Sequence, residues 1–108
     1  MSNETLFAQV KRKLNVTWND DDTTARIEEI IDSAIPDLKH KLGITDDNFD
    51  FSQKGTENTL FLNYCLYEWN HSLPEFDDNY ANTIAQCRAK HEVNNYLAGN
   101  AEGETVNA

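Results

Sequence analysis

The chain has 108 residues and a formal net charge of -10, from nineteen acidic and nine basic side chains. This length predicts one domain whose modest hydrophobic core is large enough to be stable without disulfide or metal cross-links. The acidity disfavours wrapping of DNA or binding to an anionic membrane, and no apolar run approaches the roughly 20 residues that span a bilayer. The two cysteines, Cys65 and Cys87, lack CxxC spacing, which favours buried, reduced thiols over a disulfide.

The first predicted helix lies in the amphipathic run at residues 6–16. Its apolar side chains recur at helical spacing and are Leu6, Phe7, Val10 and Leu14. Lys11, Arg12 and Lys13 are the nearest thing to a basic patch in the chain. Because no aromatic residue is interleaved with them, we interpret them as a solvated face of this helix.

The second predicted helix is long and carries the strongest periodic signal. Asp22, Thr23 or Thr24 can cap its start, and Gly43 is placed to end it. One face carries Ile27, Ile30, Ile31, Ala34, Ile35, Leu38 and Leu42. Pro36 falls on the opposite, wet side, where a helix that bends around a core is convex. We expect one helix kinked at Pro36, with two shorter helices as the alternative.

The acidic loop at residues 44–55 matches part of a calcium-binding pattern. Positions 1, 3, 5, 7 and 12 of that pattern are Asp46, Asn48, Asp50, Ser52 and Glu57. The sixth position, where the sharp turn needs glycine, is Phe51, and the ninth is the cation Lys54. We therefore expect no metal in this loop. Phe49 and Phe51 should pack beneath the helices, while the acidic side chains remain exposed to solvent.

The third predicted helix, at residues 58–70, is apolar nearly all round, and only Asn63 and Asn70 mark a polar edge. Such a helix is either central in its fold or covered by a partner. The residues that we expect at a subunit interface are Phe61, Leu62, Tyr67 and Trp69. The alternative is that this helix is simply the middle of the bundle.

Residues 70–79 are expected to connect to a last helix that ends near residue 97. Ser72 and Glu75 have capping-box spacing, and Asp77 or Asp78 could cap a slightly later start. The stripe along the last helix is Tyr80, Ile84, Cys87 and His91, with the histidine interpreted as a packed residue rather than a ligand.

The sequence as a whole predicts an all-α bundle of about four helices. From residue 99 onward the apolar content is too low to pack, which predicts a mobile C-terminal tail. The expected division is a helical domain at residues 1–98 and a flexible tail at residues 99–108.

The order and spacing of these patterns form a recognisable series. It consists of a short helix ending at Lys13–Trp18, the acidic run Asp20–Asp22, the pattern I/L-x-x-I/L-I-x-x-A at Ile27–Ala34, the closing pair Leu42-Gly43 and two further helices within 58–97. Over roughly residues 4–97 this series resembles the small head–tail connector (adaptor, or head-completion) proteins of long-tailed double-stranded DNA bacteriophages. Pro36 inside the long helix departs from that pattern.

The resemblance implies a virion protein at the head–tail junction, made in the bacterial host cytoplasm. It implies a ring of copies, expected as a dodecamer, that binds the portal protein, extends the DNA channel and provides a platform for neck and tail completion proteins. DNA would pass through without specific binding, and no membrane is involved. The acids that we expect to face the channel are Asp20, Asp21, Asp22, Asp46, Asp47 and Asp50.

No motif in the sequence points to an enzyme. The four glycines are isolated, so there is no glycine-rich phosphate loop, and His40, His71 and His91 lack zinc-site spacing. We therefore expect no catalytic residue, no cofactor and no metal ligand. The alternative to a connector is a small acidic helical regulator that sequesters a basic protein partner.

Overall fold

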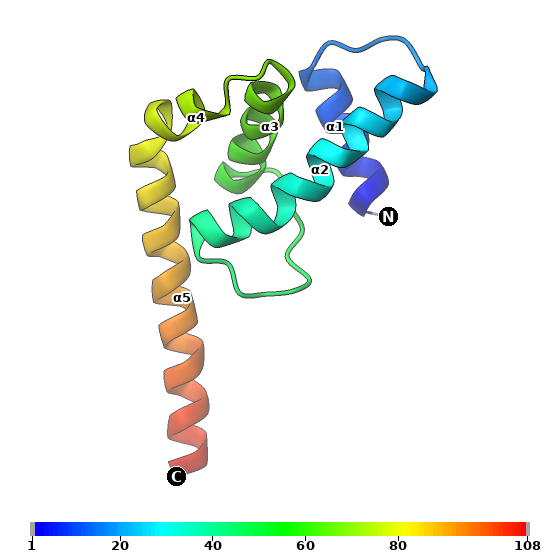
Figure 1. Ribbon diagram of the computed structural model, residues 1–108. Coiled ribbons are helices and arrows are strands. Elements are labelled where there is room, and N and C mark those ends of the chain that lie inside the picture. The colour runs from blue at the N-terminus through cyan, green and yellow to red at the C-terminus, as the bar shows by residue number, and fades with distance from the viewer. Residues whose placement is uncertain (1, 108) are drawn as a thin grey trace.

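The computed structural model describes the backbone of residues 2–107 and the side chains of residues 5–97. Its regular elements in this range are α1 (Ser2–Lys13), α2 (Asp21–Leu42), α3 (Thr56–Trp69), α4 (Leu73–Asn79) and α5 (Ala81–Asn107) (Figure 1). The all-α class predicted from the sequence is confirmed. The expected connector at 70–79 contains α4, so the described backbone has five helices rather than about four.

Helix α2 organises the core, because its apolar face packs against α1, α3 and α5 (Figure 1). The predicted stripe is confirmed: Ile27, Ile30, Ile31, Ala34, Leu38 and Leu42 are buried, and Ile35 is partly buried against them. Leu6, Val10 and Leu14 of the first helical segment join the same core, with Phe7 at its margin. Burial of each large apolar side chain of this kind stabilises the fold by about 1.5–3 kcal/mol.

Helix α2 runs unbroken through Pro36, which is exposed. The expectation of one helix rather than two is therefore confirmed. Its cap differs from the prediction: the carboxylate of Asp20 accepts a hydrogen bond from the Thr23 backbone N–H at 3.1 Å. Asp20 has extended backbone immediately before the first helical residue, and this is the position from which a side chain reaches the free N–H groups. At the other end Gly43 ends the helix in the left-handed conformation, φ 66°, as predicted.

The loop between α2 and α3 is pinned to the core by aromatic side chains. Phe51 is buried, and its ring centroid lies 4.9 Å from that of Phe61 and 4.9 Å from that of Phe49. Asn58 donates a hydrogen bond to the Phe51 carbonyl at 2.8 Å. Asp50 accepts bonds from the Ser52 N–H and hydroxyl. The expected burial of the two phenylalanines is confirmed, complete for Phe51 and partial for Phe49.

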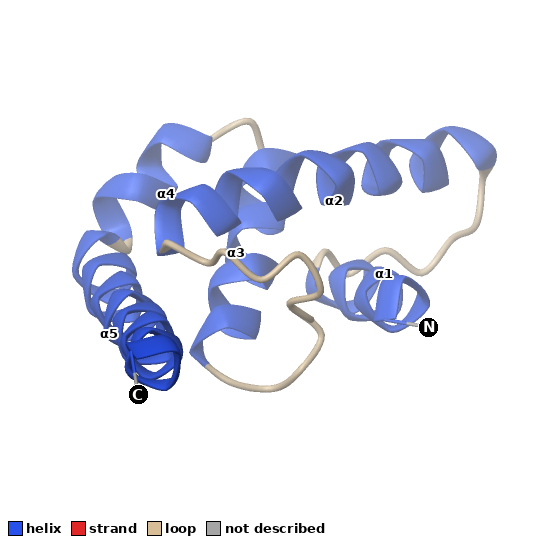
Figure 2. Cartoon of the chain, turned by 90° about the horizontal axis from the view of Figure 1, so that it is seen from below, coloured by secondary structure: helices blue, strands red, loops and turns tan. Residues whose placement is uncertain are grey.

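Helix α5 gives the molecule its elongated shape, 58 × 31 × 19 Å. Its first half lies against the other helices, and its C-terminal half extends past them (Figure 1). Figure 2, in which α5 is seen nearly end-on, shows it at one side of the other helices. The helical backbone continues to Asn107, through the segment expected to be a mobile tail. Side chains from residue 98 onward lie outside the described residues, so the mobility of that tail stays a prediction. No described helix is both long enough and apolar enough to cross a membrane.

Candidate functional site

Helix α3, where the sequence predicts a subunit interface, is largely covered by its own chain. Phe61 is fully buried by its own chain, which leaves it no exposed surface to offer to another subunit. Leu62, Tyr67 and Trp69 are partly buried and pack against the core. Helix α3 contacts α1, α2, α4 and α5, which makes it the middle of the bundle, the alternative left open by its sequence.

Side chains from segments distant in the sequence cover the C-terminal end of α3. The Arg26 guanidinium lies 4.2 Å from the Trp69 ring centroid and donates a hydrogen bond to the Trp69 carbonyl at 2.6 Å. The Tyr67 ring contacts Phe76 of α4 edge-on, with centroids 5.8 Å apart. The capping-box spacing of Ser72 and Glu75 matches the start of α4, but no pattern within this segment places Phe76 over Tyr67.

Large exposed apolar side chains occur instead at two other places. Val93, Tyr96 and Leu97 of α5 are 56 %, 69 % and 56 % exposed, and they form what we call the α5 patch. Their i, i+3, i+4 spacing puts them on one face of the helix. Trp18, 52 % exposed, lies in the loop between α1 and α2. In Figure 1 that loop and the C-terminal half of α5 lie at opposite ends of the molecule.

Hydrogen bonds to the C-terminal end of α2 hold α5 in place up to the α5 patch. Arg88 donates to the carbonyls of His40 at 2.8 Å and Lys41 at 3.2 Å, and Asn95 donates to the Gly43 carbonyl at 3.1 Å. The last carbonyls of a helix lack intrahelical partners and carry partial negative charge, so a guanidinium is well suited to them. These hydrogen bonds therefore fix the orientation of the helix that carries the α5 patch relative to α2.

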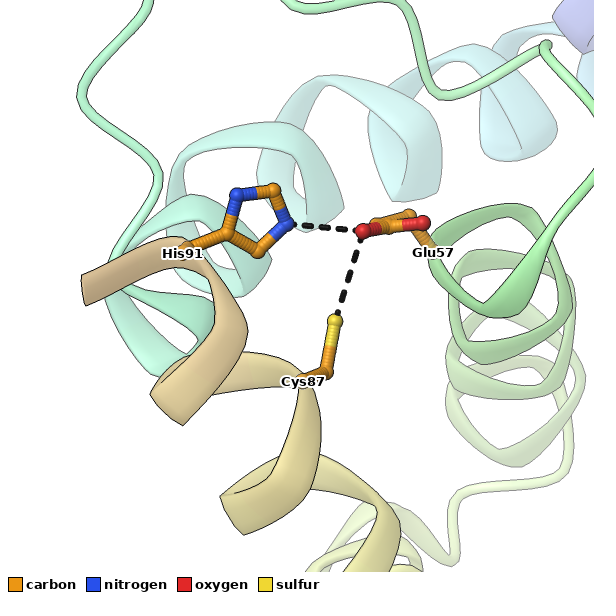
Figure 3. Close-up of side chains that lie close together, drawn as sticks. All are labelled: Glu57, Cys87 and His91. Carbon is orange, nitrogen blue, oxygen red and sulfur yellow. Dashed lines mark hydrogen bonds and ion pairs between the residues drawn. The ribbon is translucent and has the colours of Figure 1, made fainter. Parts of the chain in front are cut away.

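Helix α5 is also joined to α3, by a cluster of side chains around the Glu57 carboxylate (Figure 3). Oε2 of Glu57 lies 2.6 Å from Nζ of Lys90, 2.7 Å from Nε2 of His91 and 3.5 Å from Sγ of Cys87. The Glu57 side chain is 14 % exposed, whereas that of Lys90 is 53 % exposed. Burial is the largest influence on the pKa of Glu57 and raises it, but hydrogen bonds from Lys90, its own backbone and His91 outweigh burial and lower the pKa to about 2.

The geometry of this cluster does not suit a cysteine nucleophile. Burial, followed by the neighbouring Glu57 charge, raises the pKa of Cys87 to about 11. The thiol donates to a carboxylate rather than to a histidine, whereas an activated cysteine needs a base or a positive charge beside it. Spacing on one helix signals only Cys87 and His91; the third member, Glu57, is 30 and 34 positions away from them and gives no local signal.

The low pKa of Glu57 predicts a pH-dependent contribution to stability. Its ordinary pKa is 4.5, so the ionised group contributes fully above about pH 4.5, and the contribution is lost as the pH falls toward 2. We expect Glu57→Gln to be less stable than the wild type at neutral pH, with the difference shrinking across that window. Chemical denaturation over the pH range measures this. Glu92→Gln, an exposed acid of α5 paired with Arg88, is the control and should show a much smaller change. A Glu57→Gln difference that is constant with pH would contradict the assignment.

The six acids expected to face a DNA channel form two groups rather than one surface. Asp20, Asp21 and Asp22 lie at the start of α2, and Asp46, Asp47 and Asp50 lie in the loop after its end. A helix of 22 residues separates them by about 33 Å. Asp46 accepts a hydrogen bond from the Asn48 N–H at 2.9 Å, so, like Asp20 and Asp50, it also shapes its own backbone. Whether either group faces a channel stays a prediction.

Taken together, the described residues present a helical body and one projecting helix with an exposed apolar patch. Neither feature specifies a reaction. The Glu57 cluster offers potential metal ligands but no nucleophile. Comparison with known proteins adds no assignment, because no family model, no curated protein and no solved structure matches the chain.

Proposed function

We propose that the protein is a head–tail connector of a long-tailed bacteriophage, a virion structural protein that binds the portal as a ring, extends the DNA channel and provides a platform for neck and tail proteins. The order of helical patterns over residues 4–97 supports this proposal. The observation that carries it is the α5 patch, because a single copy leaves Val93, Tyr96 and Leu97 more than half exposed. Exposed aromatic and aliphatic side chains on one face are characteristic of protein interfaces.

The positions of the exposed apolar residues fit a ring. A closed ring needs heterologous contacts, in which one surface of a subunit meets a different surface of the next. Trp18 lies in the loop between α1 and α2 and the α5 patch lies midway along α5, so the two exposed apolar sites belong to different elements and each can meet a different neighbour, either another copy or the portal. The net charge of -10 supports a passive channel, because an acidic wall does not hold phosphates as DNA slides past.

The same charge favours the second candidate, a small acidic regulator that sequesters a basic protein. In that case attraction between opposite charges would supply the binding, and the α5 patch would have a minor part. The two candidates therefore differ in partner and in salt dependence.

Co-sedimentation separates the two candidates. The full chain is mixed with the purified portal protein of the same phage or, in parallel, with polylysine as a basic probe. A connector should sediment with the portal and stay bound when salt is raised, because apolar contacts are not screened. A regulator should bind polylysine in preference and be released by salt. Absence of portal binding under all salt conditions would contradict the connector.

A further inference from the structure

Three side chains of the cluster in Figure 3 bring together three different metal-binding atoms. The Glu57 carboxylate, the Cys87 sulfur and the His91 imidazole place one ligand atom each within 4.8 Å of the others. Cys87 and His91 are four residues apart, so they project from the same face of α5. Glu57 approaches them from the first turn of α3. Cys87 is buried, and the other two are partly buried.

We propose that Glu57, Cys87 and His91 form a zinc-binding site that ties α3 to α5. Thiolate, imidazole and carboxylate are the three ligand types that Zn²⁺ takes in proteins, whereas Ca²⁺ and Mg²⁺ require oxygen ligands alone. This proposal goes beyond the connector function and does not depend on it.

Two of the three interatomic distances can be compared with a tetrahedral site, and the third, between the Cys87 sulfur and the His91 nitrogen, is no more than 4.8 Å. Zinc bonds of about 2.0–2.3 Å place ligand atoms roughly 3.2–3.8 Å apart. The carboxylate and sulfur atoms are already 3.5 Å apart, while the carboxylate and imidazole atoms are 2.7 Å apart. In the proposed site the second pair would separate by about half an ångström, and the sulfur and imidazole atoms, which lie within 4.8 Å of each other, would come to a similar spacing through rotation of the Glu57 and His91 side chains. Binding would take the proton from the thiol to solvent and require His91 to present an unprotonated Nε2.

A cavity beside the cluster supplies access. It has a volume of about 250 Å³ and is lined by Thr56, Thr83, Gln86, Cys87 and Lys90. Three protein ligands leave one tetrahedral position open, and a cavity of this size has room for the water that would complete it.

Lys90 occupies the position of a competing cation. Its ammonium group lies 2.6 Å from the same Glu57 oxygen, and its side chain is 53 % exposed. An exposed lysine side chain can turn into solvent when an ion takes its place. The carboxylate therefore keeps a positive partner in both states, the ammonium without metal and the zinc ion with it.

Cobalt, which substitutes for zinc and is coloured, tests the site directly. Co²⁺ is titrated into the reduced, metal-free full chain and then displaced with Zn²⁺. We expect one equivalent to bind with a thiolate-to-cobalt charge-transfer band, and Zn²⁺ to remove that band. Cys87→Ser should abolish the band, and Cys87→Ser or His91→Gln should weaken zinc binding more than about tenfold. His40→Gln, at an exposed histidine, is the matched control and should bind as the wild type does.

Lys90→Gln distinguishes a metal-binding site from a cluster that only stabilises the fold. Removal of the competing ammonium should tighten cobalt binding about two- to fivefold, although the metal-free protein loses an ion pair. The absence of a charge-transfer band in the wild type would overturn the proposal. A band that survives in Cys87→Ser would also overturn it, by placing the metal at Cys65. Lys90→Gln binding that is no tighter than wild type would overturn the site as drawn, and this holds even where Cys87→Ser fails to fold.

Discussion

Replacing Phe61 with alanine should lower the free energy of unfolding by about 3–5 kcal/mol. The side chain is fully buried in α3, and its ring lies 4.9 Å from that of Phe51 at their centroids. Its loss therefore opens a cavity and also loosens the loop that Phe51 holds against the core. Urea denaturation followed by circular dichroism measures the change.

Leu62→Ala is the matched control for Phe61, because the neighbouring side chain is only partly buried. It should cost less than half as much as the change at Phe61, since the remaining space is open to water. If Phe61→Ala left the free energy of unfolding within about 1 kcal/mol of wild type but abolished assembly, Phe61 would face a partner and the bundle described here would be wrong.

The double variant Tyr96→Ser/Leu97→Ser should fold normally and fail to assemble. Both side chains are more than half exposed, so each change should alter the free energy of unfolding by no more than about 0.5 kcal/mol. If the α5 patch is the contact surface, loss of an aromatic anchor and its aliphatic neighbour should weaken portal binding about 100-fold or more. Co-sedimentation with the portal and thermal melting, measured on the same samples, separate the two effects.

The control for the α5 patch is Asn82→Ser/Asn94→Ser, which makes the same kind of substitution at two exposed polar residues of the same helix. It should bind the portal as the wild type does. Equal loss of binding in both double variants would point to damage to α5 as a whole. Unchanged binding in Tyr96→Ser/Leu97→Ser would remove the α5 patch from the interface.

Patterns within single elements predicted much of the fold. The stripe on α2 requires only that apolar residues recur every three to four positions, and the structure buries all of that stripe except Ile35, which is partly buried. The continuity of α2 through Pro36 follows from the wet side on which Pro36 lies. The cap was placed two to four residues too late because Asp20, Asp21 and Asp22 all carry the required carboxylate, and only the backbone conformation selects one of them.

Features that depend on contacts between distant segments were not predictable in this way. The all-round apolar character of α3 could not distinguish cover by α4 from cover by another subunit, and the structure shows that Phe61 is buried by its own chain. The Glu57 cluster joins residues 30 and 34 positions apart. The α5 patch could not be predicted for the opposite reason: Val93, Tyr96 and Leu97 have helical spacing, but no pattern shows that the other helices leave this face of α5 uncovered.

Electron microscopy of the full chain mixed with its portal protein tests the central proposal most directly. The connector predicts a ring of copies stacked on the portal, coaxial with its channel, with Val93, Tyr96 and Leu97 buried against a neighbouring protein. Portal particles without added density would contradict the connector. A ring in which the α5 patch faces solvent, with the copies joined through other surfaces, would contradict the role given to that patch.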